Sequence, residues 1–242
     1  MTPLPASPGL APDWEIALGA ARAERFGGPG HDLVTVAGFM KAPDTAIAAA
    51  ILQKFAKITP QYPGLRAALP ELVCRAWIAA LAPLLDAHFG KATRGWQMQA
   101  WFSLVTTPPA ALLPIQRLPH VDGTDPAQVA MMLYLHRTGH GGTAFFRHLA
   151  TGLEALTAET YPRYAAAVQA EYGRTGLPPA AYPTDGAPHF ARTHAVPGEF
   201  NAAVFYRGNI LHSGVIDNAA PLSADPREGR LTINAFFRPA AA

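Results

Sequence analysis

"QVAMMLYLHRTGHGGTAFFRH", residues 128–148, is the stretch that decides the fold class of this chain. Both of its ends are short runs of aliphatic and aromatic residues, as strands have, and the glycine-rich "RTGHGG" between them is typical of a turn. Similar short runs occupy residues 96–106, 201–206, 209–216 and 230–237. Most of the chain after residue 95 is therefore expected to consist of short strands.

Helical patterns dominate the chain before that point and return once after it. "PDTAIAAAILQKFAKI" (43–58) has apolar residues at helical spacing after Asp44, which is a candidate N-cap. "LRAALPELVCRAWIAALAPLLDAHFG" (65–90) predicts a helix pair or a proline-kinked helix that ends near Gly90. Residues 151–173 again have helical composition.

This order of elements predicts one α+β domain over residues 1–242. Its core, residues 96–238, is expected to be a double-stranded β-helix of the jelly-roll or cupin-like type, braced by a mainly helical N-terminal part at 1–95. The helical segment 151–175 is then an insertion in the core. The proline-rich stretch 177–200 is long enough to be a lid over a site, and a surface excursion is the alternative.

The composition is that of an ordinary globular protein: 50% of the residues are hydrophobic, 15% are charged, and the formal net charge is +2. The chain has no basic run, which argues against nucleic-acid binding, and prolines and charges interrupt each apolar run before the ~18 residues of a membrane span. Residues 1–14 lack a signal-peptide pattern and are expected to form a loose arm or an extended packing segment. The single cysteine, Cys74, is expected to be a buried, inert thiol, which agrees with a cytoplasmic protein.

"LPHVDG" (118–123) places His120 and Asp122 two residues apart. In an extended segment such residues point to the same side, so an imidazole and a carboxylate could meet at one point; a turn with a hydrogen-bonded aspartate is the alternative. "NILHSG" (209–214) adds His212 in a strand-like run. Two histidines and one carboxylate form the facial triad of non-haem Fe(II) enzymes, which leaves coordination positions open for other ligands.

"RLTIN" (230–234) supplies a pattern that suits a carboxylate ligand. Arg230 and Thr232 share one face of the expected strand, and a guanidinium fork with a hydroxyl beside it fits a small dicarboxylate. An edge-strand arginine in solvent is the alternative. Asn234 lies on the same face and either approaches the pocket or packs, and Trp101 is a candidate aromatic wall.

Together these residues resemble the pattern of the Fe(II)/2-oxoglutarate-dependent dioxygenases, which is HxD, a distal His, and then a basic residue on the following strand. The resemblance covers residues 96–238, and "LPHVDG" and "LYLHRTGHGGTAFF" (133–146) are most similar to the prolyl-4-hydroxylase-like branch. It implies that Fe(II) is held by His120, Asp122 and His212, and that the distal carboxylate of 2-oxoglutarate is held by Arg230 with Thr232 and Tyr134.

The resemblance further implies an enzyme that consumes 2-oxoglutarate and dioxygen, releases succinate and CO2, and hydroxylates a C–H bond of an amino acid, a peptide or a small metabolite. Arg230 stands where that branch often has lysine. The interval from His212 to Arg230 is longer than usual in such enzymes, so the residues between them are expected to form an enlarged hairpin loop.

Other interpretations stay open at this point. A cupin-like enzyme could hold zinc or iron with the same residues and use no 2-oxoglutarate, and a non-catalytic binding protein could keep the same scaffold. His136 and His140 are either an alternative metal pair or the polar tip of a hairpin. His189 and His194, in the proline-rich stretch, either lie at the surface or face a substrate from a lid.

Overall fold

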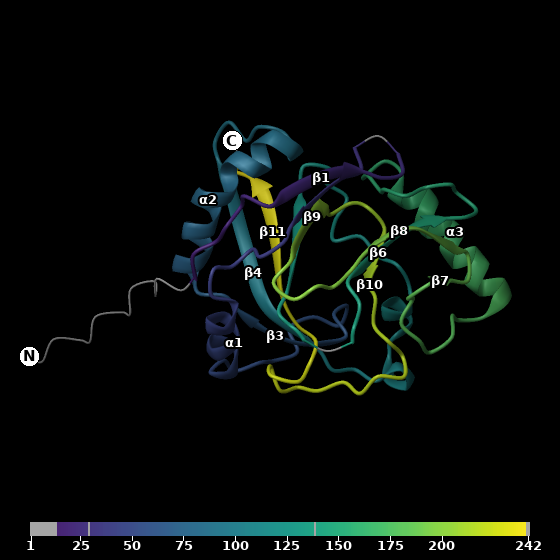
Figure 1. Ribbon diagram of the computed structural model, residues 1–242. Coiled ribbons are helices and arrows are strands. Elements are labelled where there is room, and N and C mark those ends of the chain that lie inside the picture. The colour runs from purple at the N-terminus through teal and green to yellow at the C-terminus, as the bar shows by residue number, and fades with distance from the viewer. Residues whose placement is uncertain (1–13, 29, 138, 241–242) are drawn as a thin grey trace, which may run out of the picture.

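Two packed antiparallel sheets and three α-helices make up the part of the chain that the computed structural model describes, residues 14–28, 30–137 and 139–240 (Figure 1). The predicted N-terminal arm lies mostly outside these residues. The larger sheet has the strand order β1-β2-β9-β5-β11-β4-β3 and the smaller has the order β10-β6-β8-β7. The strands of the larger sheet are β1 (Ala21–Arg25), β2 (Asp32–Val36), β3 (Gly64–Ala68), β4 (Trp96–Val105), β5 (Val129–Tyr134), β9 (Ala203–Arg207) and β11 (Leu231–Pro239). Those of the smaller sheet are β6 (Thr143–His148), β7 (Gly186–Ala187), β8 (Phe190–Val196) and β10 (His212–Gly214).

Successive strands of the core pass back and forth between the two sheets. β5, β9 and β11 belong to the larger sheet, and β6 and β10, which lie between them in the chain, belong to the smaller sheet. This alternation is the connectivity of a double-stranded β-helix, so the predicted fold class is confirmed. The two expected hairpins are wrong. β5 does not pair with β6, nor β10 with β11, because each connection carries the chain from one sheet to the other.

The N-terminal part is less helical than predicted. β1, β2 and β3 all join the larger sheet, and β3 pairs with β4 where the sequence favoured the start of a helix. The helix α1 (Pro43–Ile51) is shorter than expected, and Asp44 lies in its first turn, whereas Ala42 is the N-cap. The helix α2 (Glu71–Phe89) ends at Gly90 as predicted, because Gly90 adopts a φ of 90°, which favours glycine.

The C-terminal half also differs from the prediction in two places. The helix α3 (Tyr161–Thr175) begins later than the expected insertion. The proline-rich stretch 177–200, expected to be irregular, contains β7 and the longer strand β8 of the smaller sheet. Strand pairing with β6 therefore orders a segment that has little strand-like pattern of its own.

Helices cover the outer faces of both sheets (Figure 1). On the larger sheet, α2 packs Trp77 and Leu81 into one core with Phe102 and Phe205. Contrary to the expectation from its proline and charges, α2 is long and apolar enough to cross a membrane by length and composition, the one such helix among the described residues. Cys74 lies on its buried face, and burial raises the pKa of the thiol, as expected for an inert cysteine.

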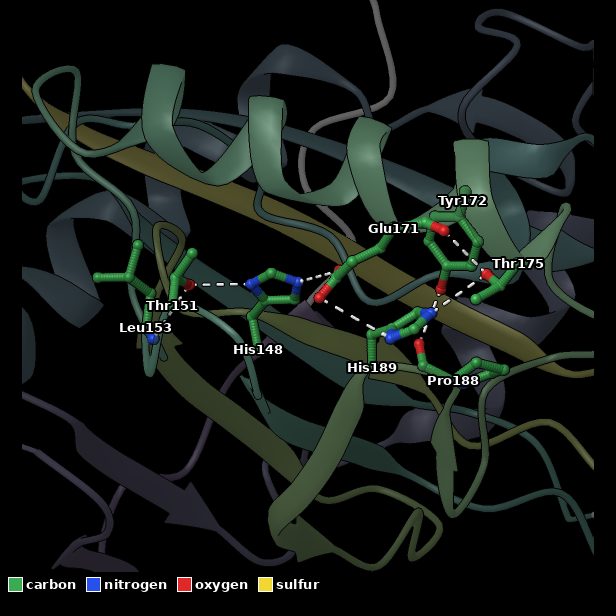
Figure 2. A network of polar contacts seen from close by, with 8 residues as sticks. All are labelled: His148, Thr151, Leu153, Glu171, Tyr172, Thr175, Pro188 and His189. Atoms are coloured by element: carbon green, nitrogen blue, oxygen red, sulfur yellow. Dashed lines mark hydrogen bonds and ion pairs between the residues drawn. The ribbon is translucent and has the colours of Figure 1, made fainter.

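A buried polar network fixes α3 to the smaller sheet (Figure 2). His148 of β6 is fully buried, and its Nε2 lies 2.8 Å from Glu171 Oε2 on α3. The other carboxylate oxygen of Glu171 lies 3.8 Å from His189 Nδ1, and the Tyr172 hydroxyl donates to the Pro188 carbonyl at 2.8 Å. The network thus ties the helix both to β6 and to the segment that leads into β8.

The inner faces of the two sheets are more polar, and they enclose a cavity. Cross-strand register places Arg66 on β3, Ser103 on β4, Thr232 on β11 and Tyr134 on β5 in one row. Their neighbours along each strand point outward into the apolar core, because side chains alternate between the faces of a sheet. Four strands of the larger sheet therefore bring polar side chains to one region.

Candidate metal centre

His120, Asp122 and His212 are brought together by backbone hydrogen bonds between the segments that carry them. His120 and His212 exchange two such bonds, of 2.9 and 2.8 Å, and the Asp122 amide donates to the Gly208 carbonyl at 2.8 Å. The candidate ligand atoms of the three side chains all lie within 4.8 Å of one another. The structure therefore places around one point the three residues that the sequence singled out.

Hydrogen bonding fixes the tautomer of His212. Its Nδ1 lies 2.8 Å from the Ile210 carbonyl oxygen, which can only accept, so Nδ1 carries the proton. The lone pair is then on Nε2, which lies 3.4 Å from Asp122 Oδ2. His120 Nε2 lies 3.9 Å from Asp122 Oδ1. Both imidazoles thus present Nε2 towards the same carboxylate, as ligands of one shared ion would.

Burial disfavours every charge in this cluster. Desolvation raises the pKa of Asp122 to about 6, although His120 and Arg66 oppose the rise. Desolvation also lowers the pKa of His212 to about 4. Desolvation, followed by the neighbouring His212, lowers the pKa of His120 to about 4, even though half of that side chain faces the cavity. At neutral pH the cluster therefore consists of two neutral imidazoles and a carboxylate whose ionisation is costly.

The Asp122 carboxylate has the properties of a ligand for a divalent cation. Its Oδ2 is buried and has no hydrogen-bond partner in the part of the chain that the structure describes. An unsatisfied buried oxygen costs free energy, and a cation at this point would satisfy it. Two imidazole nitrogens and one carboxylate oxygen suit iron, zinc and similar divalent metals. The residues present therefore fit a mononuclear metal centre.

The cluster opens on a cavity of about 380 Å³ between the two sheets, and Arg230 lines the same cavity. Only 2% of Arg230 is exposed. Its Nε donates to the Gly141 carbonyl at 3.3 Å, and its Nη2 donates to the carbonyls of Gly141 and Gly142 at 3.1 and 2.9 Å. No described residue accepts a hydrogen bond from its Nη1. The backbone thus fixes the guanidinium plane and leaves one of its donors for a ligand.

Thr232 and Tyr134, which the sequence placed beside that arginine, lie one layer behind the cavity wall. The Thr232 hydroxyl donates to Asn234 Oδ1 at 2.7 Å, and the hydroxyls of Tyr134 and Thr143 are hydrogen-bonded at 2.8 Å. Asn234 and Thr143 themselves line the cavity. Thr232 and Tyr134 therefore reach it through hydrogen-bonded neighbours, and Asn234 approaches the pocket.

The other histidines lie away from the cluster. His136 and His140 are buried, with ring centroids 6.3 Å apart, so they are not the polar tip of a hairpin. His189 packs beside α3, and His194 is partly buried, with its Nε2 3.3 Å from Glu24 Oε1 on β1. None of the four lines the cavity.

The sequence patterns did not predict three further residues of the cavity wall: Arg66, Tyr62 and Tyr182. The carbon centre of the Arg66 guanidinium lies 4.1 Å from the centre of the Tyr62 ring and 5.7 Å from that of Trp101, which does not itself line the cavity. Tyr182 enters from the proline-rich stretch, and its hydroxyl donates to the Thr107 carbonyl at 2.5 Å. No local pattern marks these residues, because their position depends on the pairing of distant segments.

Several solved structures are similar to this one. HygX from Streptomyces hygroscopicus, solved with nickel and 2-oxoglutarate bound, is 10% identical, with a TM-score of 0.50 over 87% of this chain and 84% of that one. The form that also contains hygromycin B gives the same TM-score at 12% identity and the same coverage. A Pseudomonas putida prolyl-4-hydroxylase has a TM-score of 0.47 at 15% identity, over 87% of this chain and 94% of the other. No curated protein sequence matches the chain.

The fold and the residue cluster together define a double-stranded β-helix protein with a His–Asp–His site of the kind that holds a metal. The resemblance in fold that the sequence patterns predicted is confirmed. By sequence, the chain belongs to the family described as "Family of unknown function (DUF6445)", whose model matches residues 19–237.

Proposed function

We propose that this protein is a non-haem Fe(II)/2-oxoglutarate-dependent oxygenase that hydroxylates a C–H bond of an amino acid, a peptide or another small metabolite. One observation carries the proposal: the His–Asp–His cluster and the buried, partly unpaired Arg230 open on one cavity. A metal enzyme with no anionic co-substrate has no need of a guanidinium at this place. The neighbours HygX and the prolyl-4-hydroxylase add only the shared fold.

His120, Asp122 and His212 would hold the metal through two Nε2 atoms and a carboxylate oxygen. Bound Fe(II) would supply the activation of dioxygen that is coupled to the decarboxylation of 2-oxoglutarate to succinate and CO2. The chain's own contribution is to present three ligands on one side of the ion and to leave the cavity side open. The hydrogen bond from His212 Nδ1 to the Ile210 carbonyl orients that ring and makes its Nε2 a better donor.

Arg230 would bind the distal carboxylate of 2-oxoglutarate. Its planar fork is held in place by the carbonyls of Gly141 and Gly142, so little side-chain entropy is lost when a ligand binds. The guanidinium lies beside β10, because its Nη2 is 3.5 Å from the position that a Cβ of Gly214 would occupy. β10 also carries His212, so the arginine and the metal ligand come from adjacent parts of the cavity wall.

The test is an anaerobic titration of metal-free protein with Fe(II) and then 2-oxoglutarate, followed by visible absorption. We expect a charge-transfer band that requires both additions, is absent in His212→Ala, and needs at least about tenfold more 2-oxoglutarate in Arg230→Gln, since a charge-assisted hydrogen bond is lost. Metal binding without any response to 2-oxoglutarate would instead favour the cupin-like enzyme. Binding of neither would favour a non-catalytic protein.

A further inference from the structure

Arg66 is a second arginine in the wall of the cavity, and its guanidinium is unpaired. It projects from β3, which forms the edge of the larger sheet, and it stacks on the Tyr62 ring. Within the described part of the chain the side chain makes no hydrogen bond and no ion pair, and its Nε is buried without a partner. Arginine stays protonated in proteins, so a half-buried cation without an ion-pair partner among the described residues is left here.

Two other arginines differ from Arg66, the buried Arg230 and the partly buried Arg207. Arg230 donates to the carbonyls of Gly141 and Gly142, and Arg207 donates to those of Pro126 and Phe89. The fold thus supplies backbone acceptors to both of these side chains, although the Nη1 of Arg230 is left without one. Arg66 is held in position by aromatic rings, which orient a guanidinium while leaving its N–H groups free. Such a side chain is fixed in position and can still donate hydrogen bonds to a ligand.

Two further hydroxyls in this region lack well-formed hydrogen bonds. The Tyr62 hydroxyl and Ser103 Oγ are both buried and interact with each other, but neither makes a well-formed hydrogen bond among the described residues. Ser103 lies directly opposite Arg66 in the β3–β4 register, and Tyr62 lines the cavity beside the guanidinium. The unused Nε of Arg66, with these two hydroxyls beside it, predicts an acceptor-rich, negatively charged partner. A planar carboxylate matches the fork of an arginine.

The same arginine lies on the side of the cavity where the proposed metal ligands are. Its charge opposes the rise that burial causes in the pKa of Asp122, yet the two side chains form no ion pair. A ligand held by Arg66 would therefore lie near the cluster without displacing Asp122. The cavity of about 380 Å³ is within the usual range for small-molecule sites, which leaves space for a second small molecule beside 2-oxoglutarate.

We propose that Arg66, assisted by the Tyr62 hydroxyl, binds a carboxylate of the substrate, so that the substrate is a small carboxylic acid such as a free or N-acylated amino acid. This inference rests on the proposed function, because it assigns the second ligand of the same cavity. Arg66 acts in it as a specificity-determining residue. The competing assignment is that Arg66 holds the distal carboxylate of 2-oxoglutarate and Arg230 does not.

The experiment uses the full chain loaded with Zn(II) and 2-oxoglutarate, so that ligand-observed NMR is free of paramagnetic broadening. The probes are the free L-amino acids and their N-acetyl derivatives, each paired with its primary amide. In the wild type we expect some free acids to bind and their amides to bind at least about tenfold more weakly. Arg66→Gln should abolish this preference, and Arg66→Lys should restore part of it, since charge returns without the fork.

The affinity for 2-oxoglutarate, taken from the Fe(II) charge-transfer titration, separates this inference from the proposed function. We expect Arg66→Gln to stay within about twofold of the wild type and Arg230→Gln to lose at least about tenfold. The reverse pattern would overturn the assignment of Arg66 while leaving the oxygenase intact. Equal binding of acids and amides, or no binding of any acid, would also overturn it. Absence of the band in the wild type would count against the proposed function itself.

Discussion

Asp122 combines burial with an ionisable group that lacks a partner. Its pKa is raised to about 6 from the ordinary value of 3.8, so the folded state holds the proton more tightly than the unfolded state does. The contribution of this group to the stability of the metal-free protein is therefore lost as pH rises from about 4 to about 6, and the loss persists above that range. A neutral residue at this position avoids the loss.

We expect Asp122→Asn to stabilise the metal-free protein by about 1–3 kcal/mol at pH 7.5 and to have little effect near pH 3.5, where both states are protonated. The measurement is chemical denaturation of both proteins with a chelator present. Addition of Zn(II) should stabilise the wild type and leave the variant unchanged, since the carboxylate ligand is gone. A stability difference between the two proteins that does not vary with pH would show that ionisation of Asp122 does not destabilise the folded state.

For single residues, the sequence was informative where two functional residues share one extended segment. His120 with Asp122, and Arg230 with Asn234, lie at even spacings on extended segments and therefore face one side. Arg66 could not be predicted in this way, because its neighbours in the cavity come from other strands. Only the three-dimensional pairing of β3 with β4 shows that it belongs to the site.

Among the elements, the connection from β5 to β6 has a strict steric requirement at Gly142. A Cβ on Gly142 would lie 2.2 Å from the Val196 carbonyl oxygen, which belongs to the backbone and cannot move away cheaply. The Gly142 carbonyl also accepts the Nη2 hydrogen bond of Arg230. The close approach that lets this connection cross between the sheets therefore also fixes the arginine of the proposed co-substrate site.

Gly142→Ala should lower the free energy of unfolding by about 3 kcal/mol or more, since overpacking against backbone cannot relax easily. Gly139→Ala is the matched control in the same connection, because a Cβ there would meet nothing within 4 Å. Urea denaturation of the two variants gives the comparison. Equal stability of both would show that the backbone separation between Gly142 and Val196 is not maintained in solution.

The network of α3 in Figure 2 is the second element whose contribution can be measured. Glu171→Ala leaves His148, which is fully buried, without its 2.8 Å partner, and we expect a loss of about 2–4 kcal/mol. Gln169→Ala, at an exposed position of the same helix, should change stability by less than about 0.5 kcal/mol. If thermal unfolding shows the same change for both, the network does not hold the helix.

The elements that the sequence mispredicted share one physical cause. The "LRAA" of β3 has good helix formers but pairs with β4 at the sheet edge, and β8 has little strand pattern but pairs with β6. In both cases tertiary pairing overrides local propensity. The long strands β4 and β11 were predicted well, because each carries enough alternating residues for its pattern to be distinctive.

Over the whole molecule, the cavity lies between the sheets, and its ligand groups come from both. His212 stands on the smaller sheet, whereas Arg66 stands on the larger one and Arg230 immediately precedes a strand of it. Ligands that contact both sides bind the folded state only, and each adds stability of RT ln(1 + [L]/Kd), or about 2.7 kcal/mol at a hundredfold excess over Kd. The metal and the co-substrate should therefore stabilise the packing of the two sheets against each other.

This geometry predicts a specific pattern of hydrogen exchange. Zn(II) alone should slow exchange of the amides around β10, where His120 and His212 exchange backbone hydrogen bonds. Addition of 2-oxoglutarate should extend protection to β11, and Arg230→Gln should remove this second step while keeping the first. Protection by 2-oxoglutarate that remains confined to the smaller sheet would mean that the ligand does not reach Arg230. Protection of both sheets by the metal alone would mean that the sheets are already coupled through the cluster.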